Sequence, residues 1–110
     1  AFDLVLADVP CSGSGAWARN PDAKWRLTRR RLDEMLALQD RVLGDAAELV
    51  RPGGRLVYAT CSLLEAENGE RIAAFLARNS EFMPGSPPLR LTPADGADGF
   101  FAATLLRSAG

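Results

Sequence analysis

The chain has 110 residues, of which 47% are hydrophobic and 25% charged, and its formal net charge is −1. This composition is typical of one globular domain and excludes a disordered chain, because the apolar fraction is high and the charges nearly balance. No apolar run approaches the ~20 residues of a membrane span. The lack of histidine excludes Ser-His-Asp and Cys-His catalysis within the chain. With Cys11 and Cys61 as the only thiols, we expect no metal site and a reducing, cytoplasmic setting.

The first half of the chain predicts a strand, a loop and a long helix. Residues 2–7 form a short apolar run, typical of a buried parallel strand. Prolines and glycines then indicate a loop from Asp8 to Arg26. From Thr28 onward apolar residues recur at helical spacing, interrupted only by Gln39. We expect the helix to stop in a turn at Arg51-Pro52-Gly53-Gly54.

A second strand and a second helix are expected next. Residues 55–60 are the strand, and Ser62 and Glu65 stand at capping-box spacing. This spacing predicts a helix that begins directly after Cys61 and ends near Asn79.

The remaining residues complete an α/β pattern. Residues 84–98 are rich in proline, glycine and aspartate and predict a loop, within which 89–91 is a candidate hairpin partner for a last strand over 99–106. Alternating strands and helices of this kind predict the C-terminal half of a doubly wound, Rossmann-like sheet. The chain starts without Met in a central-type strand and has no G-x-G-x-x-G loop. We therefore expect residues 1–110 to be a partial domain of a longer protein, with an open apolar sheet edge.

Reactive side chains follow both central strands. Asp8 and Cys11 come after the first strand, and Cys61 comes after the second. Because ligands bind beyond the carboxyl ends of parallel strands, these side chains are expected at one cleft. A capped helix directly after Cys61 would lower the pKa of its thiol from about 8.5. The alternative is structural: buried cysteines at strand ends are common, and Asp8 would then cap its loop.

Two thiols and a carboxylate, with no metal and no histidine, suit one reaction in particular. Carbon 5 of cytosine attacks a methyl donor only after a thiolate has added to carbon 6. An acid near N3 and the amino group stabilises the charge that develops on the ring. A second thiol then helps to remove the C5 proton and expel the first.

Positive charge is concentrated in one segment. Six of the 13 basic residues lie between positions 19 and 31, where only Asp22 opposes them, and Trp17 and Trp25 lie in or beside the same segment. Basic residues interleaved with aromatic ones favour a nucleic acid partner. The alternative is a solvated entry to the long helix with buried tryptophan rings.

Two motifs resemble those of the RNA cytosine-C5 methyltransferases. Asp-Val-Pro-Cys-Ser-Gly at 8–13 and Tyr-Ala-Thr-Cys-Ser at 58–62 are similar to the PC and TC motifs of that family, nearest to the bacterial small-subunit rRNA enzymes of the Fmu/Sun (Nop-type) group. Arg-Pro-Gly-Gly-Arg-Leu-Val before the second motif, Glu67-Asn68 after it and Asp-Gly-Phe-Phe at 98–101 extend the similarity over nearly the whole chain.

The resemblance implies a Rossmann-like fold, S-adenosylmethionine as methyl donor and ribosomal RNA as partner. By resemblance Cys61 is the nucleophile, and Cys11 helps to release the methylated product. Asp8 would contact the cofactor or the target base, and Pro10 would shape the same part of the cofactor site. The residues that would face RNA phosphates are Lys24, Arg19 and Arg26.

Three other functions remain open at this point. In the similar DNA cytosine-C5 enzymes the PC cysteine attacks, which would make Cys11 the nucleophile. The family's Gly-rich cofactor loop would lie upstream of Ala1, so we expect this chain alone to be inactive. A second alternative is therefore a non-catalytic RNA-binding module. A redox protein would need a reversible disulfide between the two cysteines, which lack C-x-x-C spacing.

Overall fold

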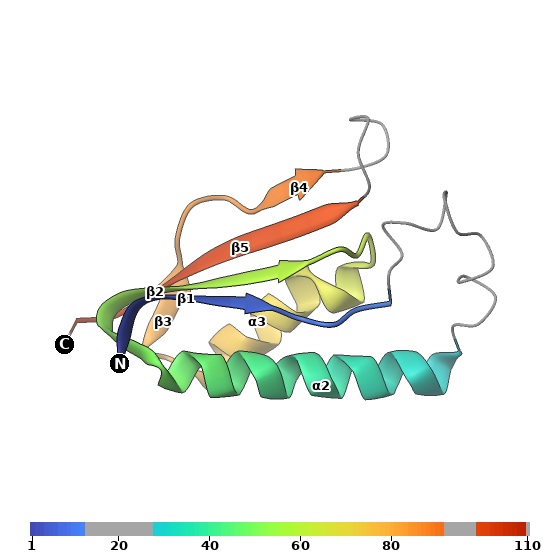
Figure 1. Cartoon of the computed structure of the whole chain (residues 1–110), viewed down its shortest axis with the longest axis horizontal. Helices are drawn as coiled ribbons and strands as arrows, with labels where there is room; N and C mark the ends of the chain where they lie inside the picture. Colours follow the sequence, from blue (N-terminus) through green and yellow to red (C-terminus); the bar gives the residue numbers. More distant parts are fainter. Residues whose placement is uncertain (13–27, 92–98, 110) are drawn as a thin grey trace.

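The computed structural model describes residues 1–12, 28–91 and 99–109. Figure 1 shows a twisted sheet with helices packed beneath it. The elements in chain order are β1 (Phe2–Asp8), α2 (Arg29–Glu48), β2 (Val50–Thr60), the 3-10 helix η2 (Glu65–Glu67), α3 (Gly69–Arg78), β3 (Phe82–Pro84), β4 (Leu89–Leu91) and β5 (Phe100–Arg107). The predicted α/β class is confirmed.

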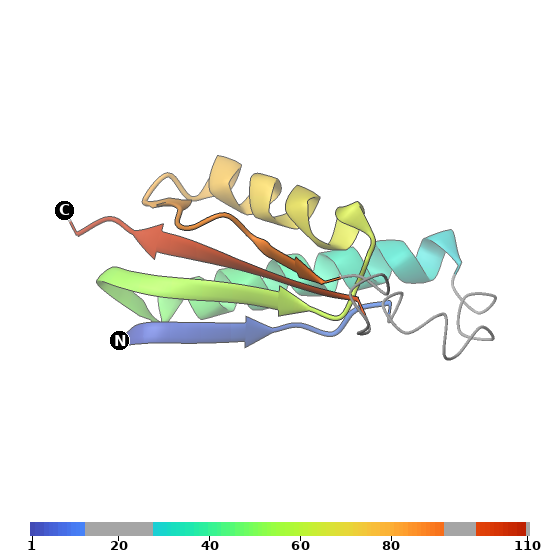
Figure 2. The same cartoon turned by 90° about the horizontal axis from the view of Figure 1, so that it is seen from above.

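The unit β1–α2–β2 is a parallel crossover. β1 pairs with β2 in parallel, from Leu4 opposite Arg55 to Asp8 opposite Ala59, as their predicted adjacency requires. The order is β1-β2-β5-β3, and β4 also pairs with β5, which runs antiparallel to β2. Figure 2 shows the β1 and β2 arrows pointing the same way and β5 pointing back. The expected hairpin between 89–91 and the last strand is therefore confirmed.

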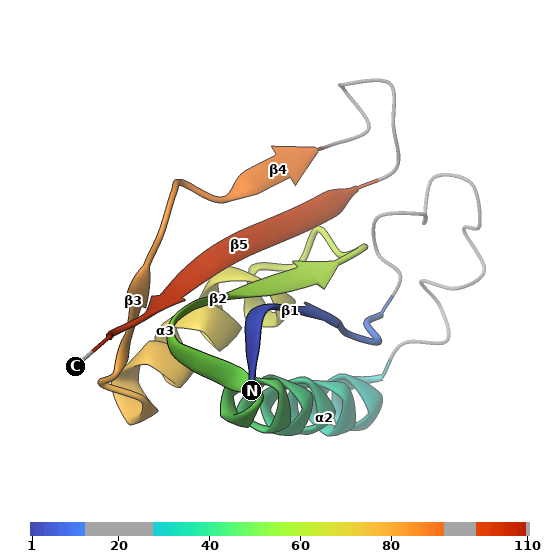
Figure 3. The ribbon, with the colours of Figure 1, turned by 60° about the vertical axis from the view of Figure 1, so that its left-hand side comes forward.

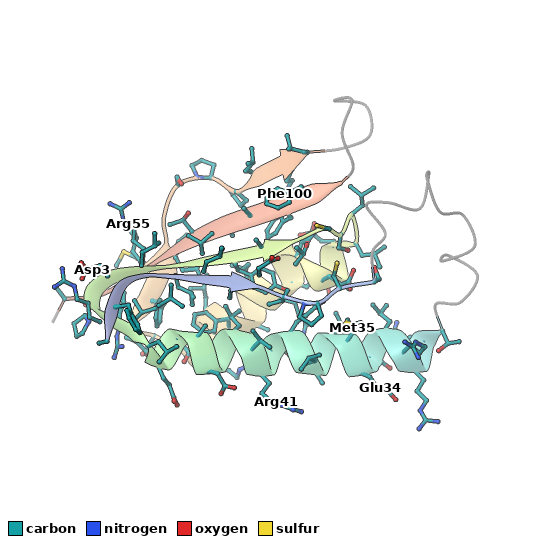
Figure 4. All side chains as sticks on the ribbon, in the orientation of Figure 1. Asp3, Glu34, Met35, Arg41, Arg55 and Phe100 are labelled. Atoms are coloured by element: carbon teal, nitrogen blue, oxygen red, sulfur yellow. The ribbon has the colours of Figure 1, made fainter. Side chains whose placement is uncertain are left out.

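The helices cover one face of this sheet (Figure 3). Thr28 caps α2 by accepting a hydrogen bond from the Arg31 backbone N–H at 3.1 Å, which starts the helix where the sequence predicted. Arg71 of α3 donates to Asp40 of α2 at 2.7 Å. The buried core lies between the helices and the inner face of the sheet, and its largest fully buried hydrophobic side chains are Leu43, Leu56, Tyr58, Phe75, Phe101 and Leu105. On the outer side of α2, Glu34 and Arg41 project away from the sheet (Figure 4).

The predicted turn at Arg51–Gly54 is wrong, because those residues lie within β2. Val50 pairs with Phe2, and the next pair is Leu4 with Arg55, so residues 51–54 form a bulge on the β2 side. Gly53 has φ of 83°, which favours glycine at this point of the bulge. The strand starts early because the Phe2 N–H donates to the Leu49 carbonyl at 2.7 Å, which continues the ladder past the glycines.

The predicted capping box after Cys61 is also wrong. The helix α3 begins at Gly69, and residues 61–64 are irregular before the short helix η2. The Ser62 hydroxyl accepts from the Leu64 N–H at 3.0 Å and donates to the Glu67 carboxylate, so Glu65 is not its partner. A buried tertiary partner outcompetes the local cap, and the helix N-terminus is not next to Cys61.

Candidate functional site

Two loops carry the cysteines: the Cys11 loop, described over residues 9–12 after β1, and the Cys61 loop, residues 61–64 after β2. The parallel pairing of β1 and β2 brings both loops to the same edge of the sheet. Asp8 lies opposite Ala59 at the carboxyl ends of β1 and β2, and the Val9 N–H donates to the Ala59 carbonyl at 3.0 Å. Cys61 is exposed and Cys11 is half-buried, and neither forms a disulfide. The predicted placement of both thiols beyond one pair of strand ends is therefore what the fold produces.

The carboxylate of Glu67 joins these two loops. Glu67 is fully buried at the end of η2. From the Cys11 loop, Ser12 donates its backbone N–H to Oε1 and its hydroxyl to Oε2, both at 2.7 Å. From the Cys61 loop, the Ser62 hydroxyl donates to Oε2. One side chain thus holds the residue that follows each cysteine.

Gln39 of α2 also bonds to the Cys11 loop. Its amide Nε2 donates to the Pro10 carbonyl at 2.8 Å and to Glu67 Oε1 at 3.2 Å. Gln39 is fully buried, although it lies on the apolar stripe of α2. Gln39 was visible in the sequence as the one polar residue in that apolar stripe, but its contacts with Pro10 and Glu67 had not been predicted.

The Cys61 loop is braced from below by Thr60 and Asn68, both buried. The Thr60 hydroxyl donates to Asn68 Oδ1 at 2.6 Å, and the Asn68 amide donates to the Ser62 carbonyl at 2.8 Å. The Ser62 N–H donates to the Thr60 hydroxyl at 3.2 Å. The backbone around Cys61 is therefore held by hydrogen bonds on both sides of the thiol.

Tyr58 supports Glu67 from the core. Its hydroxyl donates to the Glu67 backbone carbonyl at 2.7 Å. Burial raises the pKa of the Tyr58 phenol well above its usual value of 10.0, and the negative charge of Glu67 raises it further. Tyr58 is consequently a neutral hydrogen-bond donor under all ordinary conditions.

The predicted effect of a helix terminus on Cys61 has no structural basis here. α3 begins at Gly69, eight positions after the cysteine, and η2 has three residues. In the structure Cys61 is instead exposed, and it lies on a loop whose backbone is held by hydrogen bonds from Thr60 and Asn68.

The other predicted site residues are placed as follows. Asp8 is the last residue of β1, Pro10 lies in the Cys11 loop that follows it, and both are exposed. Lys24, Arg19 and Arg26, as well as both tryptophans, lie outside the described residues. Of the basic residues in the described start of α2, Arg29 and Arg30 form exposed pairs with Asp33 and Glu34 at 3.1 and 3.2 Å. Such pairs are typical of a solvated helix face.

Cavities lined by described residues differ in their relation to the cysteines. One of about 550 Å³ lies between α2 and α3, and none of the predicted site residues lines it. Another, of about 100 Å³, lies beside the Cys61 loop, between Ser62 and Asn68 on one side and Phe100 and Phe101 on the other. Arg90 also lines it, with its guanidinium 4.8 Å from the centre of the Phe101 ring.

Within the described ranges, His, Cys, Asp and Glu side chains form no group of three or more that would hold a metal ion. None of the helices that the structure describes combines the length and apolarity required to cross a membrane.

Sequence comparison relates nearly the whole chain to one family. Residues 1–106 match the family described as 16S rRNA methyltransferase RsmB/F. The chain is 42% identical over 113 residues to ribosomal RNA small subunit methyltransferase B of Enterobacter sp. (strain 638), and 39% identical over 114 residues to the protein of that name in Pectobacterium carotovorum. These alignments cover 96% and 97% of this chain but 26% and 27% of the relatives. The chain therefore spans about a quarter of their length.

Solved structures share the fold. The crystal structure of PH0851 matches 94% of this chain, with a TM-score of 0.86 and 41% identity, over 26% of its own length. NSun6 from Pyrococcus horikoshii, solved with SFG, matches 96% of this chain, with a TM-score of 0.76 and 28% identity, over 29% of its own length.

Proposed function

Because this chain belongs to the 16S rRNA methyltransferase RsmB/F family, we propose that it carries the two catalytic cysteines of a longer enzyme that methylates carbon 5 of a cytosine in ribosomal RNA. The observation that carries the proposal is the joint placement of the Cys11 and Cys61 loops at one sheet edge, tied together through Glu67. Two thiols held at one site suit a reaction in which one thiol attacks and another assists its departure.

The residues at this edge fit part of a site for S-adenosylmethionine. Asp8 offers an exposed carboxylate at the carboxyl end of β1, where ligands of open α/β sheets bind, and Pro10 shapes the loop beside it. SFG, present in the NSun6 structure, is an analogue of this cofactor. When bound, S-adenosylmethionine supplies an electrophilic methyl group. The remainder of the site, including a Gly-rich loop, would come from outside this chain.

In the proposed reaction Cys61 is the nucleophile. Its thiolate forms a bond to C6 of the cytosine, and the electron pair of the C5–C6 double bond becomes available at C5 for methylation. Cys11, or a water held by it, then takes the C5 proton. The electrons of the C5–H bond restore the double bond as the Cys61 S–C6 bond breaks. Exposure of Cys61 on a braced loop supports its role as the attacking group, and the half-buried position of Cys11 suits a group that acts second.

The RNA contact is proposed for the basic segment. Lys24, Arg19 and Arg26 follow the Cys11 loop in sequence, and their charges suit phosphates near the target base.

The test compares wild type, Cys11→Ala and Cys61→Ala in the full-length protein that contains this chain. Each protein is incubated with S-adenosylmethionine and a cytosine-containing rRNA fragment and run on a denaturing gel. We expect a stable RNA–protein band to accumulate in Cys11→Ala, because its adduct forms and is not released. The band should be absent in Cys61→Ala, with methyl transfer lower by about a thousandfold or more, because the covalent route is lost.

The two cysteine variants serve as matched controls for each other, since each leaves one thiol in place. An adduct that persists in Cys61→Ala and disappears in Cys11→Ala would reverse the roles and favour the DNA-type mechanism. If no protein formed an adduct or transferred a methyl group, a non-catalytic RNA-binding module would become the better description.

A further inference from the structure

We propose that Glu67 is a positioning residue that sets the relative placement of Cys11 and Cys61, so that both thiols address the same nucleotide. The inference rests on the proposed function for its purpose, but the positioning itself is a property of the protein alone. Glu67 acts through Ser12 and Ser62, the residues that directly follow the two cysteines.

The two carboxylate oxygens divide this task. Oε1 accepts from the Ser12 backbone N–H at 2.7 Å and from the Gln39 amide at 3.2 Å, so it holds the Cys11 loop and anchors it to α2. Oε2 accepts from the Ser12 hydroxyl at 2.7 Å and also from the Ser62 hydroxyl. Oε2 is thus the point at which the loops after β1 and β2 meet.

A carboxylate is well suited to this position. An ionised carboxylate only accepts hydrogen bonds, and here four neutral donors converge on one buried group. Hydrogen bonds to a charged acceptor are about twice as strong as neutral ones. The contacts between Glu67 and Ser12 span 55 positions in sequence, so they tie together loops that local structure alone would leave independent.

The first test measures thiol reactivity, which requires no substrate. In the full-length protein, the alkylation rates of Cys11 and Cys61 by iodoacetamide are followed by mass spectrometry of the peptides that contain them. We expect Glu67→Ala to raise the alkylation rate of the half-buried Cys11 by about fivefold or more, the factor that matches the loss of one net hydrogen bond holding its loop, and to change the rate of the exposed Cys61 much less. Glu67→Gln should restore most of the protection, because its amide oxygen accepts at the Oε1 position and its NH₂ donates to the two serine hydroxyls.

Two controls separate positioning from general stability. Glu65→Ala removes an exposed carboxylate from the same short helix, one that pairs with Arg90 at 3.1 Å. Gly54→Ala destabilises the protein at the opposite end of β2, where an added Cβ would come within 2.9 Å of the backbone oxygens of Arg51 and Asp3. Both should leave the two alkylation rates unchanged, even though Gly54→Ala lowers the melting temperature. Equal effects of Gly54→Ala and Glu67→Ala on the thiols would overturn the proposal.

Single-arm variants keep the proposal testable if Glu67→Ala does not fold. Ser12→Ala should raise the reactivity of the half-buried Cys11, whereas Ser62→Ala should raise it less, because Ser62 lies in the other loop. In the full reaction Ser12→Ala should accumulate the RNA adduct, whereas Ser62→Ala should slow its formation. Combined in one protein, the two serine changes should have less than the sum of their separate effects, because both hydroxyls donate to Glu67 Oε2 and the three side chains act as one unit. Fully additive effects would contradict a shared contact through Glu67.

The positioning role of Glu67 and the proposed function of the protein can fail separately, and the experiments give a different result in each case. If thiol reactivity responds as expected but wild type transfers no methyl group, Glu67 positions the loops and the proposed function is wrong. If wild type methylates RNA but Glu67→Ala alters neither thiol, the function stands and the positioning role is wrong.

Discussion

Five polar side chains are fully or almost fully buried in the described part of the chain, and each either belongs to one of the two cysteine loops or bonds to one: Gln39, Thr60, Ser62, Glu67 and Asn68. Burying such groups costs free energy unless they find hydrogen-bond partners, and here they bond to one another and to the loop backbone. Gln39 Oε1 is an exception, because it is buried and has no hydrogen-bond partner among the described residues. Apolar side chains at these five positions would stabilise the core equally well. The polar network therefore indicates a requirement for defined loop geometry at this edge.

At this scale Tyr58 predicts a pH dependence of stability. Its pKa is raised in the folded protein, so above its usual value of 10.0 the unfolded chain releases a proton that the folded protein retains. Stability is fully present below pH 10 and should fall above it by about 1.4 kcal/mol per pH unit. Urea midpoints at about pH 9 and pH 11 check this. Tyr58→Phe should start about 1 kcal/mol lower and lack this part of the decline; equal declines would show that other groups are responsible.

Among the elements, glycines in α2 and in the bulge of β2 illustrate how one residue type serves opposite roles. Gly44 lies inside α2, and a methyl group added there would contact nothing within 4 Å. Gly54 lies in the bulge, and an added Cβ would come within 2.9 Å of the backbone oxygens of Arg51 and Asp3. The first glycine only weakens a helix, whereas the second allows β1 and β2 to approach each other.

Alanine substitutions should therefore act in opposite directions. Gly44→Ala should stabilise the protein by about 0.5–1 kcal/mol through helix propensity. Gly54→Ala should destabilise it by about 1–3 kcal/mol, because backbone atoms must move apart. Urea unfolding of both variants against wild type measures the difference. A neutral Gly54→Ala would mean that the bulge readjusts without cost.

At the scale of the whole molecule, the helices that the structure describes all cover the same face of the sheet (Figure 3). On β1, which is an edge strand here, Phe2, Leu4 and Leu6 are 60%, 61% and 64% exposed on the opposite face. Large exposed apolar side chains beside an unpaired strand edge favour association. The chain also spans about a quarter of the length of its relatives, and we propose that in a longer protein this edge is covered.

The isolated chain should accordingly self-associate. Sedimentation velocity at rising concentration should show a shift to larger species, and the double substitution Leu4→Lys, Leu6→Lys should suppress it by placing charge on the exposed face. Leu89→Lys is the matched control, because this leucine is 53% exposed but lies on β4. Association that survives the β1 substitutions would place the contact elsewhere.

The sequence alone determined the order of the main elements and the pairing of the two cysteine loops at one edge. Apolar runs and helical periodicity are local patterns, so the strand at 2–7, the α2 start at Thr28 and the final hairpin were all predictable. The predicted burial of that first strand was wrong, because β1 lies at the end of the strand order and Phe2, Leu4 and Leu6 are exposed. Parallel strands in a crossover place their carboxyl ends together, so the joint position of Cys11 and Cys61 followed.

Only the tertiary structure decided how these loops are held. The capping-box spacing of Ser62 and Glu65 predicted a local contact, but Ser62 instead bonds to Glu67, which Ser12 and Gln39 reach from distant parts of the chain. The strand that begins at Val50 similarly depends on its pairing with Phe2 across the sheet. Local preferences amount to about 1 kcal/mol, and buried long-range hydrogen bonds and strand pairing outweigh them. Such partners are set by the fold and not by sequence spacing.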